Sequence, residues 1–537
     1  MNILPILWIQ VSITFVLVFL RTHSVNRTLM KPPKDYKAKL LSVLSQPGNS
    51  IVKHLWKLGA IRRQLILLSS VPRLYTNEDD YSSITVSDSA EKQLLIEKLN
   101  ANEQPTKKIY GFFHPYCNAG GGGEKVLWKA VETTLQDASD NVVIIYTGDS
   151  DVNGSTILQN VIDKFDYNLD KDRIVFIFLK YRYLVDSNTW SHFTLLGQAL
   201  GSIILSIEAL LRCPPDVWCD TMGYSFGYPW VYHLLRIPIV AYTHYPVIST
   251  DMLNKLLNQK QTLKVKLKYC YWKLFMLYYQ HMGTFVSISI TNSTWTNNHI
   301  KQIWSKADQK IIYPPCSTEK LVRTDNSTGR TNQAIILAQF RPEKRHKLII
   351  SSYGKFIEKN PTLVDKLPNL LFIGSTRSKS DEDYVKELRE YGQELNIPDK
   401  KCKFMLNVSY DEIKDILNAS KFGINAMWNE HFGIAVVEYL AAGLIPIVHA
   451  SAGPLLDIVI DDSVGFFFKD ETDPDFTNYE TYKSLDVVLQ DAINLDEPKR
   501  IEMSETGQKI AVEKFSDMKF NDNWQELVLN KLNKKDK

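Results

Sequence analysis

The sequence predicts an α/β protein with two Rossmann-like domains facing each other across a cleft, and with a transmembrane helix at its amino terminus. Three observations support this prediction. The chain has 537 residues, more than a single hydrophobic core normally serves. From residue 107 onward, short apolar runs alternate with longer helical stretches, as in parallel sheets covered by helices. The first residues include a long apolar stretch without charge.

The apolar stretch predicts a membrane anchor within residues 1–21. Residues 3–20 carry no charged side chain and would span roughly 27 Å as a helix, close to the roughly 30 Å hydrocarbon core of a bilayer. A secretory signal peptide is the alternative, but its basic residues would precede the apolar stretch. Here they follow it, from Arg21 to Lys39, opposed by Asp35 alone. The positive-inside rule then places the rest of the chain in the cytosol.

Residues 22–106 suggest a stalk and membrane-proximal segment. Within it, residues 51–74 are basic and partly amphipathic. This stretch either lies on the membrane surface, with its basic side chains near anionic head groups, or forms an ordinary helix packed on the first domain. The sequence leaves both alternatives open.

Two domains and a tail are expected after the stalk. We place an N-terminal (acceptor) domain at residues 107–315, a C-terminal (donor) domain at residues 316–500 and a helical segment at residues 501–537. Continuous apolar runs are typical of parallel strands buried on both faces. The runs that predict such strands cover residues 107–114, 141–148, 173–179, 237–245, 333–340, 369–375, 421–427 and 445–451.

Another apolar stretch, residues 195–211, is almost long enough to span a membrane. It contains Glu208 and two glycines and lies between predicted strands. We therefore expect a buried or membrane-surface helix rather than a second span. Aromatic residues cluster between Tyr269 and Phe285, which is compatible with a membrane-facing surface and equally with a large core.

Charge and cysteine content exclude several classes of function. The formal net charge is +3, and no basic stripe is interleaved with aromatic residues, so no nucleic-acid partner is expected. The six cysteines show neither a C-x-x-C pair nor the spacing of a zinc site. They predict free thiols in a reducing compartment and no metal centre.

A glycine-rich motif, Asn118-Ala-Gly-Gly-Gly-Gly-Glu124, follows the first predicted strand and opens a helix predicted over residues 124–135. Glycines let a backbone approach a ligand closely, and amides at a helix N-terminus favour an anion. The spacing excludes a P-loop and fits the dinucleotide fingerprint poorly. A flexible loop without a ligand is the alternative. The candidate binding residues are Gly121, Gly122 and Gly123.

The strongest functional motif is the glutamate pair Glu430 and Glu438. Glu430 follows a predicted strand, and Glu438 lies in an early turn of a helix expected to begin near residue 433. A carboxylate there can accept hydrogen bonds from both hydroxyls of a ribose, and the loop carboxylate can hold sugar hydroxyls. A solvated helix face is the alternative, but both glutamates lie among apolar residues, where carboxylates need partners. Amide-rich turns that could face a sugar or its phosphate contain Phe432, Gly433, Ile434, Ser451 and Gly453.

Basic residues follow the first predicted strand of the second domain, in the segment Phe340-Arg-Pro-Glu-Lys-Arg-His. Arg341 and Lys344 could neutralise a leaving diphosphate. Ordinary surface charge is the alternative.

These motifs together resemble the retaining GT-B glycosyltransferases of family 4. More narrowly, NAGGGGEKVLW, HYPVIST, FRPEK, WNEHFGIAVVEYLAAG and SAGPLLDIV resemble the GDP-mannose:dolichol-linked oligosaccharide α-1,2-mannosyltransferases of asparagine-linked glycosylation. The resemblance covers residues 107–530 and extends to the amino-terminal anchor.

The resemblance implies roles for the candidate residues. Glu438 would bind the nucleotide ribose, and Glu430 would contact the transferred mannose. Arg341 and Lys344 would meet the diphosphate, although many family members place this arginine five residues before the lysine rather than three. The glycine motif would line the phosphate and acceptor side, and His244 would lie near the sugar.

The resemblance also implies the reaction and its setting. Mannose would pass from GDP-mannose to Man3GlcNAc2-PP-dolichol with retention, as the fourth and fifth mannoses, on the cytosolic face of the endoplasmic reticulum membrane. Charge on the leaving diphosphate can be stabilised without a metal or other cofactor. Other mannosyltransferases of the pathway are possible partners. Two alternatives stay open: a related enzyme with another nucleotide sugar or lipid acceptor, and an inactive membrane scaffold that kept the fold.

Overall fold

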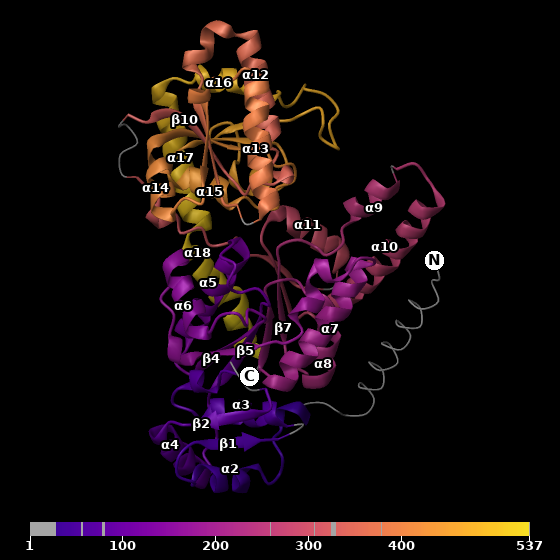
Figure 1. The fold of residues 1–537 in the computed structure, drawn as a ribbon, viewed down its shortest axis with the longest axis vertical. Coiled ribbons are helices and arrows are strands. Elements are labelled where there is room, and N and C mark those ends of the chain that lie inside the picture. The colour runs from indigo at the N-terminus through magenta and orange to yellow at the C-terminus, as the bar shows by residue number, and fades with distance from the viewer. Residues whose placement is uncertain are drawn as a thin grey trace. The chain divides into compact units, whose positions relative to one another are not determined.

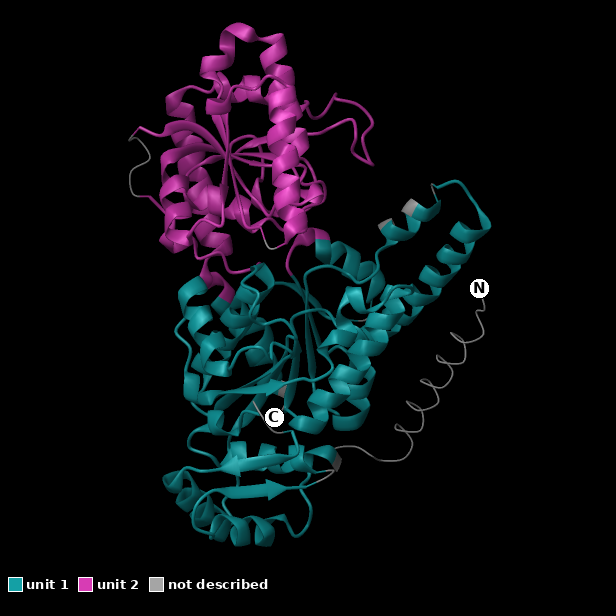
Figure 2. Ribbon diagram, viewed as in Figure 1, with its two compact units in different colours: residues 1–291, 296–312, 521–537 teal, residues 292–295, 313–520 magenta. Residues whose placement is uncertain are grey.

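The computed structural model describes residues 28–54, 57–77, 81–257, 259–305, 307–323, 329–376 and 378–535. The chain forms two compact units (Figure 2). Unit 1 comprises residues 1–291, 296–312 and 521–537, and unit 2 comprises residues 292–295 and 313–520. The anchor predicted within residues 1–21 lies outside the described residues.

Unit 1 is built on a seven-stranded parallel sheet with the order β5-β4-β3-β6-β7-β8-β9 (Figure 1). All seven residues of β4 and all five of β5 are buried, as continuous apolar runs predict for a sheet covered on both faces. The direction of strand addition reverses between β3 and β6, and ligands bind at such switch points in open parallel sheets. The strands are β3 (Lys108–Phe113), β4 (Asn141–Thr147), β5 (Ile174–Phe178), β6 (Val217–Asp220), β7 (Ile239–Thr243), β8 (Ile288–Thr291) and β9 (Gln309–Ile311).

Helices connect these strands. The ones in unit 1 are α5 (Gly122–Asp137), α6 (Gly154–Phe165), α7 (Thr194–Arg212), α8 (Tyr228–Leu235), α9 (Thr250–Leu257) and α10 (Leu263–Met282), with most of α11 (Thr294–Ile303). Helix α7 covers the apolar stretch at 195–211, and it is the one described helix that is long and apolar enough to cross a membrane. Over half of it is buried within the fold, at 56%.

The described part of residues 22–106, for which the sequence suggested a stalk, is folded onto the sheet of unit 1. It contains α2 (Tyr36–Leu44), β1 (Ser50–Lys53), α3 (Leu58–Leu68), β2 (Ser83–Val86) and α4 (Ser89–Asn100), with β1 antiparallel to β2. Every residue of α3 except Gln64 is buried, and Arg63 of α3 forms an ion pair with Asp216 at 2.6 Å. Of the two alternatives for residues 51–74, the structure therefore shows packing on the first domain.

Unit 2 repeats the architecture with six parallel strands in the order β12-β11-β10-β13-β14-β15. Numbered from the first strand of the unit, this is the order 3-2-1-4-5-6 of a dinucleotide-binding fold, with its switch point between β10 and β13. The strands are β10 (Thr331–Leu337), β11 (Asn369–Gly374), β12 (Cys402–Leu406), β13 (Ser420–Asn425), β14 (Ile445–His449) and β15 (Phe466–Phe468).

The carboxyl-terminal helices belong to both units. Those of unit 2 are α12 (His346–Lys359), α13 (Lys379–Glu394), α14 (Tyr410–Ala419), α15 (Ile434–Ala441), α16 (Leu485–Ile493) and α17 (Glu497–Phe515). The boundary that we placed at residue 500 lies inside α17, which packs on α15. The end of α18 (Asp517–Trp524) and α19 (Asn530–Lys535) belong to unit 1. There Trp524 stacks on Phe112, and its indole N–H donates to Thr134 at 3.1 Å.

Candidate active site

The switch point of unit 2 brings two predicted residues into contact. Lys344 ends the short helix η9 (Pro342–Lys344) after β10, and Glu430 lies in the loop after β13. The Lys344 Nζ atom is 2.6 Å from Glu430 Oε2, and the two side chains are only 23% and 15% exposed. A charge-assisted hydrogen bond that is so poorly hydrated holds both groups in fixed positions.

Glu438 lies in the second turn of α15, as the sequence predicts, and its residue is 8% exposed. Tyr410 lies near Glu438. Burial raises the pKa of this tyrosine, and the negative charge of Glu438 raises it further. Gly433 precedes the helix with φ at +108°, a conformation that side chains disfavour. The glycine therefore allows the loop to turn directly into the helix. The Val436 amide already donates to the Gly433 carbonyl at 2.9 Å, whereas the amides of Ile434 and Ala435 have no acceptor within the helix and stay available to a ligand.

Two of the other predicted residues have structural contacts. The Phe432 ring is 3% exposed and stacks on Tyr313 at 5.7 Å. The Gly453 amide donates to the Glu430 carbonyl at 2.9 Å, and a Cβ atom at Gly453 would lie 2.4 Å from the Phe432 carbonyl oxygen. Gly453 therefore lets its turn pack against the Glu430 loop, and its amide already has an acceptor.

Ser451 belongs to a buried hydrogen-bond chain. The amide of Asn429 donates to the Ser451 hydroxyl at 2.8 Å, and this hydroxyl is 2.8 Å from Nδ1 of His449. The other ring nitrogen, Nε2, is 2.7 Å from Asp473 Oδ2. Asp473 in turn accepts from Arg345 at 2.6 Å. We call Arg345, Asp473, His449 and Ser451 the relay; it links the segment that carries Lys344 to the loop that carries Glu430.

With a neutral His449 ring and an ionised Asp473, the protons of the relay can be assigned. Burial acts to raise the pKa of Asp473, but hydrogen bonds led by the one from His449 outweigh it, and the pKa lies below the ordinary value. An ionised carboxylate only accepts, so Nε2 of His449 carries the proton and Nδ1 is left as an acceptor. The Ser451 hydroxyl then donates to Nδ1 while it accepts from Asn429.

Arg341 behaves differently from its neighbours. It is exposed, and within the described residues its guanidinium has no ion-pair partner, whereas Arg345 is paired with Asp470 and Asp473. The structure thus brings Lys344 to Glu430 and leaves Arg341 at the surface of unit 2.

The start of α11 also packs beside the Glu430 loop within unit 2. The Trp295 and His431 rings stack at 5.0 Å. Asp457 accepts hydrogen bonds from the Thr294 amide and the Tyr313 hydroxyl, both at 2.9 Å. Burial raises the pKa of Asp457, and these donors oppose the rise.

The glycine motif lies at the switch point of unit 1. Helix α5 begins at Gly122, and the Gly121 amide donates to the Glu124 carboxylate at 2.7 Å. A Cβ atom at Gly123 would lie 3.7 Å from Nε2 of His244. Gly123 and His244 are therefore neighbours, although 121 residues separate them in sequence.

His244 rests on a buried histidine. Its Nε2 donates to the Thr221 carbonyl at 3.2 Å, and the Thr221 hydroxyl is 2.6 Å from Nδ1 of His114. Burial and then the proximity of His244 lower the pKa of His114 to about 3, so this ring is neutral at physiological pH. The buried histidine at the switch point of unit 1 is thus uncharged.

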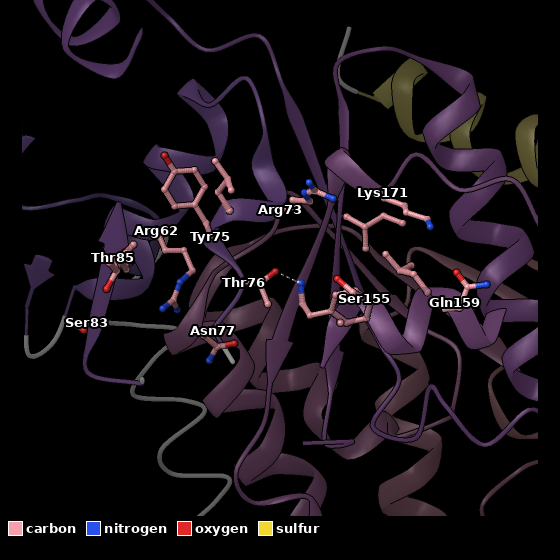
Figure 3. Close-up of a pocket in the computed structure, with 16 residues that line it drawn as sticks. Arg62, Arg73, Tyr75, Thr76, Asn77, Ser83, Thr85, Ser155, Gln159 and Lys171 are labelled. Carbon is pink, nitrogen blue, oxygen red and sulfur yellow. Dashed lines mark hydrogen bonds between the residues drawn. The ribbon is translucent and has the colours of Figure 1, made fainter. Parts of the chain in front are cut away.

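A cavity of about 690 Å³ lies elsewhere in unit 1, between α3, β2, α6 and β5, and Figure 3 shows the residues that line it. Its basic lining residues are Arg62, Arg73 and Lys171, and Arg73 pairs with Asp172 at 3.2 Å. None of the residues predicted to bind a substrate lines this cavity. The cavity is therefore separate from the candidate site.

Sequence reasoning missed the residues that support the site. His449 ends a run whose apolar character predicted a strand, and a polar residue at the carboxyl end of such a strand was the available signal. Asp473 lies in an irregular segment 24 residues further on, where no periodicity marks it. His114 and Thr221 each follow a strand at the switch point, but the four-residue β6 was too short to stand out.

Family models match both halves of the chain. The model described as "ALG11 mannosyltransferase N-terminus" matches residues 107–304, and "Glycosyl transferases group 1" matches residues 317–486. A Kluyveromyces lactis protein named GDP-Man:Man(3)GlcNAc(2)-PP-Dol alpha-1,2-mannosyltransferase is 52% identical over 503 residues, which cover 89% of this chain and 88% of that protein. A human protein of the same name is 37% identical over 449 residues, covering 80% and 87%.

Solved structures support the fold. Sucrose-phosphate synthase from Thermosynechococcus elongatus matches 80% of this chain and all of its own with a TM-score of 0.55 at 12% identity. Anabaena Alr3699/HepE, solved with UDP-glucose, matches 79% of this chain and 99% of its own with a TM-score of 0.52 at 14% identity. With its two parallel-sheet units and these relatives, the chain is a GT-B glycosyltransferase and belongs to the GDP-Man:Man(3)GlcNAc(2)-PP-Dol alpha-1,2-mannosyltransferase family.

Proposed function

We propose that the protein transfers mannose from GDP-mannose to a dolichol-diphosphate-linked oligosaccharide, with retention and in α-1,2 linkage. The acceptor is Man3GlcNAc2-PP-dolichol, which receives its fourth and fifth mannoses. The names of the relatives support the donor, the acceptor and the linkage. The retention and the two successive additions rest on the family resemblance of the sequence motifs.

The observation that carries the proposal is the Lys344–Glu430 pair at the switch point of unit 2, with Glu438 on the helix that follows. This is where a parallel sheet binds a nucleotide. We assign the ribose hydroxyls to Glu438, the hydroxyls of the transferred mannose to Glu430, and the diphosphate to Lys344 and Arg341. In unit 1 we assign His244 to the sugar and the glycines at 121–123 to the phosphate and acceptor side.

The chemistry requires stabilisation of charge rather than a protein nucleophile. As the bond between mannose and the diphosphate breaks, negative charge develops on the diphosphate; the acceptor hydroxyl attacks from the same face, and its proton passes to the departing diphosphate. The Lys344 ammonium and the amides at the start of α15 can stabilise that charge. Glu430 holds the ammonium in place beforehand at 2.6 Å, so little reorganisation is needed during the reaction.

We further propose an endoplasmic reticulum location, with a single amino-terminal anchor and both units in the cytosol. The basic residues that follow the apolar stretch support this orientation. Asn153 and Asn407 lie in sequons, and both are exposed. If the units were lumenal, these sites would be open to glycosylation. A mobility shift after endoglycosidase treatment would therefore contradict the cytosolic placement.

The deciding experiment incubates the detergent-solubilised full chain with radiolabelled GDP-mannose and a short-chain Man3GlcNAc2 diphosphate lipid. We expect one and then two mannoses to be added, both removable by an α-1,2-mannosidase. UDP-glucose and UDP-GlcNAc serve as competing donors, because one solved structure of similar fold holds UDP-glucose. Transfer from a UDP-sugar alone would favour a different glycosyltransferase. No transfer from any donor would favour an inactive scaffold.

A further inference from the structure

Helices α9 and α10 form a hairpin that projects from unit 1 (Figure 1). The second half of α10 is anchored, since Phe275, Met276, Tyr279 and Met282 are buried in the core of the unit. Residues 263–274 of the same helix include no buried residue. The packed second half of α10 therefore anchors the hairpin, and the outer half projects away from the core of unit 1.

The hairpin is strongly basic, and Asp251, near the start of α9, is its single acidic residue. From Met252 to Ala307 the sequence contains no aspartate or glutamate, although the whole chain has nearly balanced charges. None of the exposed lysines pairs with a carboxylate in the described part of the chain. These lysines are Lys260, Lys264, Lys266, Lys268 and Lys273.

Large apolar side chains are exposed beside these lysines. Leu263, at the start of α10, is 75% exposed, and Leu257 and Leu277 are 50% and 56% exposed. The Lys268 ammonium lies over the Trp272 ring at 4.7 Å, so a half-buried aromatic ring lies directly beneath a positive charge. From Met252 onward the hairpin therefore combines exposed leucines, which are unfavourable in water, with a group of like charges that repel one another.

We propose that the α9–α10 hairpin docks on the surface of an anionic membrane. Lysines beside an apolar surface are attracted by anionic head groups while leucines enter the boundary with the acyl chains. The leucines at the outer end favour lipid over a nucleic acid, because a phosphate backbone offers them no apolar contact. The hairpin gives unit 1 a membrane contact of its own, in addition to any anchor at the amino terminus. This inference does not depend on the donor or acceptor assigned above.

Cys270 provides a probe for the test, because it is exposed on the outer half of α10. Four other cysteines are buried, and Cys402, which is partly exposed, can be changed to serine. The full chain with Cys402→Ser is labelled at Cys270 with a polarity-sensitive dye. It is then reconstituted into phosphatidylcholine vesicles with or without phosphatidylserine. We expect a blue-shifted emission and quenching by doxyl-labelled lipids in the anionic vesicles, both weakened near 1 M salt, where the Debye length falls to about 3 Å. A dye that stays in water in both vesicles overturns the proposal.

Two controls separate docking from general adsorption. A dye on Ser380→Cys, at an exposed position of α13 in a chain that also carries Cys270→Ser and Cys402→Ser, should show no lipid quenching, and equal quenching there would overturn the proposal. Lys264→Glu, Lys266→Glu and Lys268→Glu combined should reduce the quenching at Cys270 by at least about fivefold, since one lysine near an anionic surface contributes about that factor. The matched change of three exposed lysines of unit 2, Lys379, Lys403 and Lys509, to glutamate should leave it unchanged. Loss of quenching in both variants would mean that net charge, not the hairpin, drives the contact.

Discussion

The two units have the same strand order up to their sixth strands, yet the side chains at their switch points differ. In unit 2 the loops present an ammonium and a carboxylate at 2.6 Å, supported by a second buried ion pair between Arg345 and Asp473. In unit 1 the corresponding place holds glycines, a threonine and a neutral His114, whose pKa burial lowers to about 3. Strand order therefore determines where a ligand can bind, while the loop residues determine which chemical part of a ligand each unit can hold.

The largest effect is expected when the charged groups at the switch point of unit 2 are removed. Lys344→Ala and Glu430→Ala should each lower kcat for mannose transfer by at least about 100-fold, because Lys344 stabilises the charge that develops on the diphosphate and Glu430 holds Lys344 in place. Steady-state assays with labelled GDP-mannose measure this. Lys347→Ala is the matched control, since Lys347 is exposed and pairs only with Glu387 on the surface. A larger loss in His244→Ala than in either variant would place the dominant electrostatic group in unit 1 instead.

Asp473→Asn should have a smaller effect through the relay. The amide has one acceptor oxygen where the carboxylate has two, so it can accept either from Nε2 of His449 or from Arg345, and its NH2 group then faces the other donor. The loop that carries Glu430 would lose its fixed position. We expect a fall of about tenfold in kcat/KM, mostly as a higher KM for GDP-mannose, which corresponds to about one lost hydrogen bond. Equal changes in the KM of donor and acceptor would contradict a specific effect on this loop.

Gly123→Ala and Gly120→Ala form a matched pair in unit 1. A Cβ atom at Gly123 has an ordinary 3.7 Å contact with His244, so the thermal midpoint should hold while activity falls severalfold if a ligand approaches this backbone. Gly120 has φ at +74°, so alanine there should cost about 1–2 kcal/mol of stability. Differential scanning calorimetry and kinetics should show these opposite patterns. Full activity in Gly123→Ala would remove this glycine from the site.

The smallest effect is the pH dependence of stability that arises from buried histidines in the two units. Burial lowers the pKa of His114 to about 3, and burial followed by the charge of Lys344 lowers that of His346 to about 4. Below about pH 6.5 the unfolded chain binds protons that the folded chain does not, so stability is retained above this pH and lost as the pH falls. Each histidine should contribute up to about 1.4 kcal/mol per pH unit. Thermal midpoints measured down to about pH 5 should fall less steeply in His114→Gln and in His346→Gln than in the parent. Unchanged slopes would contradict the lowered pKa values.

Hydrophobic pattern was sufficient to predict the central strands. Runs such as β4, β5, β7 and β14 are buried on both faces, a pattern typical of strands in a covered parallel sheet. The half-buried β12 and the short β6 lacked the signal. Glu430, Glu438 and Lys344 could be named because their spacing falls within single motifs. The residues that support them could not be named from the sequence, because His449 and Asp473 come into contact only after the chain has formed β15 and turned back.

The return of the carboxyl terminus has a consequence for synthesis. Trp524, Val528 and Leu529 are fully buried, and Trp524 stacks on Phe112. The chain leaves unit 1 after residue 312 and returns at residue 521. At ordinary translation speeds, synthesis of the intervening residues takes roughly 10–40 s. During this time unit 1 lacks the carboxyl-terminal residues that complete its core. A nascent chain of this protein should therefore need chaperone protection until release. A premature stop codon close to the carboxyl terminus should affect unit 1, most of which is synthesised first.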